Sequence, residues 1–197
     1  MAVTFSLTLF SSYDESFGRV MQSLTCMITS IVTALLLLIP LIIFRKSVPV
    51  NYILLFAFTI CESFMISALT AGLTIESVFL SEAVTVATLV GLFGGAIFCS
   101  SDVKLLVCLI IGLVVTLIAQ SVAMITLACM GYISNSWFVC YALCGAIGAG
   151  IYIMVDLLYI MIPGAMDLDD YIMGSLMLYV DIIRMFIYIL ALFGKGK

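Results

Sequence analysis

The sequence predicts an all-α membrane protein, a polytopic bundle of six full transmembrane helices preceded by a shorter apolar segment. Of its 197 residues, 65% are hydrophobic and only 9% are charged, and its mean hydropathy is +1.39. Soluble domains carry roughly 25% charged residues, so this composition excludes that class. The apolar residues also occur in stretches of about 20, the length that a helix needs to cross a hydrocarbon core of about 30 Å.

Six stretches have this length, and short connections separate them. They cover residues 24–44, 52–72, 78–98, 105–128, 138–162 and 171–193. The segment before them, residues 1–12, is apolar but only about half as long as a spanning helix. It lacks the basic start of a signal peptide, so we interpret it as the remnant of a truncated first helix. The short connections predict one transmembrane domain over residues 1–197.

Two acidic residues, Asp156 and Asp181, lie inside consecutive predicted spans. An ionised carboxylate in hydrocarbon costs at least ~2.5 kcal/mol, so such residues face a bundle interior and mark ion or proton paths. If the two face each other, repulsion and desolvation make them share one proton, and its loss would open or load a cation site. The chain has no histidine, so a pH response near neutrality has to come from such carboxylates.

Other charged residues in the spans allow a second interpretation. Arg184 follows Asp181 by three residues, so the two are neighbours on one helix face and could form a purely structural ion pair. This pair leaves Asp156 and the mid-span Glu62 without explanation, and we keep Glu62 as a candidate for the ion path. Glu82 lies near a helix end, and we expect it to be solvated.

An acidic cluster precedes the last predicted span. It consists of Asp167, Asp169 and Asp170. One interpretation is a cation antechamber, and the other is a helix N-cap at Asp169 with a second acid in the first turn. The cluster lacks the spacing of a twelve-residue calcium loop, so no high-affinity metal site is predicted.

We expect the cysteines and glycines of the spans to serve helix packing and not to bind a metal or a cofactor. The seven cysteines lie in or near the spans, where they behave as small hydrophobes, and without histidine we expect no metal centre and no cofactor. Glycines in two spans predict close helix packing in lipid. They are Gly91, Gly94 and Gly95 in one span and Gly145, Gly148 and Gly150 in the other.

The end of the chain resembles the Bax-inhibitor family. Asp169-Asp170-Tyr171, followed by LYVDII at residues 178–183, is similar to the acidic pair, tyrosine and Leu-Tyr-Leu-Asp-Ile-Ile-type motif of that family. The run IYIMVD at 151–156 resembles the penultimate helix of the family, with valine in place of a tyrosine before the aspartate. The run FAFT at 56–59, followed by Glu62, resembles the lifeguard and Golgi anti-apoptotic branch.

This resemblance implies a seven-helix bundle with a central last helix, in endoplasmic reticulum or Golgi membranes. Asp156 and Asp181 match the paired aspartates thought to form a proton-sensitive latch or pore site, and Glu62 matches a branch-specific acid. The sequence departs from the family in its short first helix and at two apolar positions. Ile43 falls close to the place of a basic latch residue, for which Arg45 is a neighbouring substitute, and Val32 falls near the place of a pore-facing acid.

The sequence therefore predicts a pH-sensitive calcium-leak channel, or a regulator of calcium stores, that modulates apoptosis with Ca²⁺ as the permeant ion. One alternative is a proton-coupled transporter. Another is a non-conducting truncated paralogue that binds other apoptosis regulators in the membrane or forms a homo-oligomer. Membrane lipid is the expected partner, and nucleic acid is not. An enzyme is not expected, because no nucleophile, base and orienting group assemble from these residues.

Overall fold

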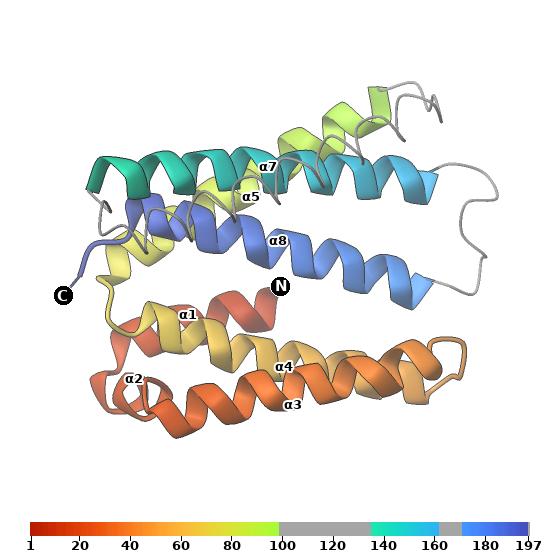
Figure 1. Cartoon of the computed structure of the whole chain (residues 1–197), viewed down its shortest axis with the longest axis horizontal. Helices are drawn as coiled ribbons and strands as arrows, with labels where there is room; N and C mark the ends of the chain where they lie inside the picture. The colour runs from red at the N-terminus through yellow and green to blue at the C-terminus, as the bar shows by residue number, and fades with distance from the viewer. Residues whose placement is uncertain (99–134, 162–170, 197) are drawn as a thin grey trace. The chain divides into compact units, whose positions relative to one another are not determined.

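A computed structural model describes residues 1–98, 135–161 and 171–196 of the chain (Figure 1). The described part is helical, apart from turns and one isolated backbone bridge between Leu73 and Gly196. The helices are α1 (Ala2–Tyr13), α2 (Glu15–Met21), α3 (Leu24–Ile43), α4 (Val50–Thr70), α5 (Ile75–Phe98), α7 (Asn135–Met161) and α8 (Tyr171–Phe193).

Five of these helices, α3, α4, α5, α7 and α8, are long and apolar enough to cross a membrane. The predicted all-helical, multi-pass architecture is confirmed to this extent. The predicted span at residues 105–128 and the acidic cluster of Asp167, Asp169 and Asp170 lie outside the described residues. The six-helix count and the central place of the last helix stay predictions.

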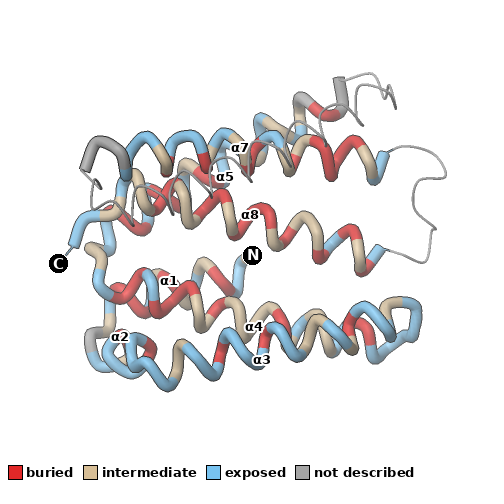
Figure 2. Tube along the Cα trace, viewed as in Figure 1, coloured by how far each residue is buried: buried red, intermediate tan, exposed pale blue. Residues whose placement is uncertain are grey.

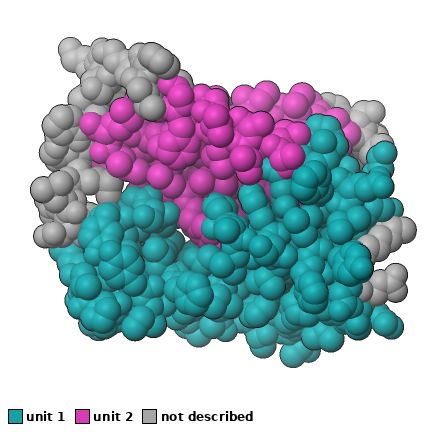
Figure 3. All heavy atoms as spheres, turned by 180° about the vertical axis from the view of Figure 1, so that it is seen from behind, with its two compact units in different colours: residues 1–82, 168–176, 193–197 teal, residues 83–167, 177–192 magenta. Residues whose placement is uncertain are grey.

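The chain divides into two compact units, which Figure 3 shows in teal and magenta. Unit 1 comprises residues 1–82, 168–176 and 193–197, and unit 2 comprises residues 83–167 and 177–192. Helices α1, α2, α3 and α4 therefore belong to unit 1. Most of α5, all of the described α7 and the middle of α8 belong to unit 2.

In unit 1, α1 and α3 both pack against α4. Helix α1 has 12 residues and is about 18 Å long, too short to span a membrane by itself. Helix α3 exposes a series of large aliphatic side chains, as Figure 2 shows by its mostly pale-blue trace. Exposed leucines and isoleucines on a helix of this length are suited to lipid contact.

Asp14 separates α1 from α2. Its backbone is extended, with φ −93° and ψ 107°, and its carboxylate accepts hydrogen bonds from the backbone N–H groups of Ser16 and Phe17. The Ser16 hydroxyl and these N–H groups lower the pKa of Asp14 from its ordinary value. This arrangement is an N-cap, which is why the apolar N-terminal segment breaks here into two helices.

The two ends of α8 lie at opposite ends of α4. At the start of α8, the Tyr171 hydroxyl lies 3.4 Å from the side-chain nitrogen of Asn51, in the first turn of α4. Beyond the end of α8, the Lys195 carbonyl accepts a hydrogen bond of 2.8 Å from the N–H of Thr74, just past the end of α4. Both ends of the last helix therefore contact unit 1.

Candidate functional site

Unit 2 brings Asp156 of α7 and Asp181 of α8 together. Their carboxyl groups are within hydrogen-bonding reach of each other. Both residues are buried, with 9% and 8% of their surface exposed. Two carboxyl groups can share such a hydrogen bond only when one of them carries a proton, because an ionised carboxylate is an acceptor only.

A cation lies beside this pair. The Arg184 guanidinium is 3.4 Å from the Asp181 carboxylate, and it also lies over the Tyr152 ring, 5.8 Å from the ring centre. The Arg184 side chain is 41% exposed, so it is less deeply buried than the carboxyl groups. The ring and the carboxylate together hold the guanidinium on the aspartate side of α8.

The helical periods of α7 and α8 explain this arrangement. Tyr152 precedes Asp156 by four residues on α7, and Arg184 follows Asp181 by three residues on α8. Residues three or four apart share one helix face, so each helix presents an aspartate and its neighbour to the other helix. The site therefore depends on the register between two apolar helices.

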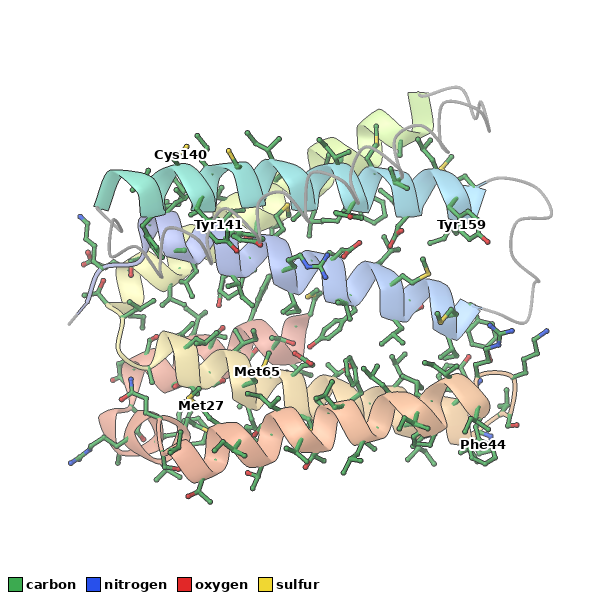
Figure 4. The ribbon with its side chains drawn as sticks, viewed as in Figure 1. Met27, Phe44, Met65, Cys140, Tyr141 and Tyr159 are labelled. Atoms are coloured by element: carbon green, nitrogen blue, oxygen red, sulfur yellow. The ribbon has the colours of Figure 1, made fainter. Side chains whose placement is uncertain are left out.

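The polar contacts between α7 and α8 extend beyond the aspartates. The rings of Tyr141 and Tyr188 meet edge to face at 5.8 Å, and their hydroxyls are hydrogen-bonded. Figure 4 labels Tyr141 on the side of α7 that faces α8. Tyr141 and Asp156 are fifteen residues apart, about 22 Å of helix, so most of the thickness of a bilayer core separates the tyrosine contact from the aspartate pair.

Gly145 makes room for the Tyr188 ring. A Cβ atom at Gly145 would lie only 2.3 Å from a carbon of that ring, whereas Gly91, Gly94 and Gly148 have no described atom within 4 Å of the corresponding position. The predicted close helix packing at these three positions therefore stays a prediction, because no described atom makes such a contact. The close contact at Gly145 is made by a tyrosine ring instead.

The other candidate residues lie in unit 1. Glu62 is half-buried on α4. Arg45 lies in the turn between α3 and α4, where its backbone oxygen accepts a hydrogen bond of 3.0 Å from the Asn51 side chain. Their roles in an ion path or a latch stay predictions.

The expectation that Glu82 is solvated is wrong. Glu82 is buried, and its carboxyl group contacts the Thr8 hydroxyl at 2.5 Å. The error came from its place near the start of α5, where helix ends are usually wet. Helix α1 covers this place, and a polar stripe gives the signal that would have revealed it: Thr4, Thr8 and Ser11 follow helical spacing along one face of α1.

Within the described ranges, no group of three or more cysteine, aspartate or glutamate side chains is arranged to hold a metal ion. The aspartate site offers two carboxyl groups and a phenol. Calcium takes 6–8 oxygen ligands in dedicated sites. The described side chains of the aspartate site therefore supply fewer oxygen ligands than a dedicated calcium site has.

Comparison with known proteins identifies the family. Residues 1–197, the whole chain, match the family model described as "Inhibitor of apoptosis-promoting Bax1". No curated protein matches the chain. The match agrees with the terminal LYVDII motif, whose aspartate lies in the buried pair, and with the five described helices that are long and apolar enough to cross a membrane. This chain, with its buried pair of aspartates between two apolar helices, belongs to the Bax-inhibitor family of multi-pass membrane proteins.

Proposed function

We propose that this protein lets calcium leak from intracellular stores, in the endoplasmic reticulum or Golgi membrane, and thereby restrains apoptosis. The buried carboxyl pair of Asp156 and Asp181 carries this proposal. It supplies oxygen ligands to a hard cation inside an apolar bundle, at a position where ionisable groups are costly and usually functional.

The number of protons bound by Asp156 and Asp181 would control whether a cation can enter the path. With one shared proton the two aspartates carry a single negative charge, which the Arg184 guanidinium neutralises. Loss of that proton leaves the site with one net negative charge in a low-dielectric environment, where it attracts a cation strongly. The path would therefore be closed at acid pH and would open as the pH rises.

Arg184 also favours a second candidate function. An ion pair on one helix face can be purely structural, and it would then hold the bundle in a non-conducting form that acts by binding other membrane regulators or a second copy of the chain. A proton-coupled transporter would use the same acids to carry protons while a solute crosses. Flux that depends strictly on a solute gradient would favour the transporter.

Calcium efflux from reconstituted vesicles tests the proposal. We expect Asp181→Asn to reduce the efflux by about tenfold or more, equivalent to about 1.4 kcal/mol, because the pair loses one of its two carboxylates. Glu76→Gln is the matched control, since it removes an acid from the exposed first turn of α5. Wild-type vesicles that release no calcium while the protein still protects cells would establish the non-conducting alternative, and equal efflux in both variants would overturn the aspartate assignment.

A further inference from the structure

Glu82 is a buried acid that lies apart from the aspartate site, in unit 1. Only 6% of its surface is exposed, and Thr8 is fully buried. The Thr8 hydroxyl oxygen lies 2.5 Å from the Glu82 carboxyl oxygen Oε1. This contact joins α5 to α1 across 74 residues of sequence.

Whether Thr8 donates or accepts the hydrogen bond in its contact with Glu82 depends on whether Glu82 is protonated. Its hydroxyl oxygen also lies 2.8 Å from the Phe5 carbonyl oxygen and 3.2 Å from the Thr4 carbonyl oxygen, and both carbonyls can only accept. A threonine hydroxyl has one proton to donate. If it donates to Phe5, the Glu82 oxygen can bond to Thr8 only by donating a proton of its own. An ionised Glu82 would instead draw the Thr8 proton away from the α1 backbone.

The charges around Glu82 favour the protonated form. Among the helices packed here, α1 has no acidic residue in its first turn and no basic residue in its last, and Glu62 is the one charged side chain of α4. On its own helix, Glu76 is exposed. The basic residue Lys195 approaches α5 through its backbone N–H, which donates to Ser77 at 3.2 Å. Among the described residues, Glu82 thus contacts the Thr8 hydroxyl and no guanidinium, and burial disfavours its ionised form.

Hydroxyl contacts hold α1 in place above this acid. The Ser11 hydroxyl donates to the Ser67 carbonyl at 2.8 Å, and the Ser12 hydroxyl donates to the Thr70 carbonyl at 2.9 Å. The Ser63 hydroxyl lies 3.0 Å from the Thr4 hydroxyl oxygen. Interhelical hydrogen bonds of this kind hold helices together where no water competes. The α1 surface that makes them also covers Glu82.

We infer that Glu82 and Thr8 form a proton-binding site, separate from the aspartate pair, in which the protonated Glu82 fastens α1 to the rest of unit 1. Loss of the proton places a carboxylate beneath α1, and water has to enter to solvate it. Helix α1 then loosens along its row of hydroxyl contacts. The inference rests on the Thr8–Glu82 contact and not on calcium conduction.

Chemical labelling and amide exchange test this inference in the full chain, reconstituted in lipid nanodiscs. Dicyclohexylcarbodiimide, an apolar reagent, adds to neutral carboxylic acids. We expect its adduct on Glu82 near neutral pH and none on the exposed Glu76, with labelling that falls as the pH rises. Over the same pH range, amide exchange of residues 2–13, corrected for its intrinsic pH dependence, should accelerate by about tenfold.

Glu82→Gln supplies the matched variant, because its neutral amide cannot ionise. It should keep residues 2–13 protected at every pH, whereas Glu76→Gln should retain the wild-type dependence. An unlabelled Glu82 in the wild type would overturn the proton site, and this readout needs no substitution. Labelling of Glu82 without any pH effect on the exchange of residues 2–13 would overturn its role in fastening α1.

Discussion

The two buried acidic sites of this chain are neutralised in different ways. At the site between α7 and α8, Asp156 and Asp181 lie close enough to share one proton, and the Arg184 guanidinium balances the charge that remains. At the site beside α1, Glu82 has a hydroxyl partner, Thr8. Among the described residues, the first site holds two acids and a cation, and the second holds one acid.

This difference predicts different behaviour when a proton is lost. At the aspartate site, loss of the shared proton changes the net charge from zero to minus one beside the partly exposed Arg184 guanidinium, and a cation that enters the path balances the added charge. The described contacts of Glu82 include no cation, so its deprotonation brings in water and disturbs packing. The aspartate pair, which has a charged partner, is thus suited to an ion path. Glu82, which has a hydroxyl partner, is suited to holding α1 against the rest of unit 1.

The largest effect on stability is expected from a substitution at Gly145 of α7, the helix that carries Asp156. Gly145→Ala places a methyl group where the Tyr188 ring lies, and such overpacking costs about 1–3 kcal/mol. Gly148→Ala is the control, because no described atom lies within 4 Å of the added carbon. Unfolding in mild detergent with increasing denaturant should separate the two variants, and exchange of residues 2–13 should be unchanged in both. Equal midpoints would show that the Tyr188 ring moves aside freely.

The next effect concerns the cation that distinguishes the two sites. Arg184→Gln removes the positive charge that favours ionisation of the aspartates, so the rise of calcium efflux with pH should move to higher pH by about one unit. Arg184→Lys keeps the charge and should move it less. Efflux measured over a pH series gives this comparison. An unmoved curve in Arg184→Gln would show that the ion pair is structural, in agreement with the non-conducting alternative.

The smallest effect is expected at the N-cap between α1 and α2. Hydrogen bonds from Ser16 and Phe17 lower the pKa of Asp14 below 3.8, so this carboxylate stabilises α2 above its ordinary pKa. The stabilisation is lost as the pH falls through the lowered folded-state value. Asp14→Ala should speed amide exchange of residues 15–21 a few-fold, and Asp14→Asn, which also caps, should speed it less. Unchanged exchange in Asp14→Ala would contradict the cap.

Much of the architecture could be predicted from the sequence because lipid imposes simple demands. A span needs about 20 apolar residues, and five predicted spans correspond to α3, α4, α5, α7 and α8. The pairing of Asp156 with Asp181 could also be anticipated, since a lone acid in hydrocarbon is costly. The proximity of Arg184 to Asp181 followed from their separation along one helix.

The rest depended on tertiary contacts that no local pattern contains. Glu82 was expected to be solvated because its position near a helix start says nothing about α1, a separate segment that covers it. Gly145 could not be distinguished from Gly148 by sequence, because only the register between α7 and α8 places Tyr188 against one and not the other. Contacts between separate helices therefore set the limit of prediction here.

The aspartate pair can be tested as the pH sensor by one measurement, calcium efflux from vesicles over a series of pH values. Wild-type efflux should rise with pH as the shared proton is lost. Asp156→Asn leaves Asp181 beside Arg184, so the site cannot gain a net negative charge and the rise of efflux with pH should be lost. Glu82→Gln should keep the wild-type curve, because its carboxyl group belongs to the other site. An Asp156→Asn curve identical to that of the wild type would contradict the assignment of the pair as the sensor.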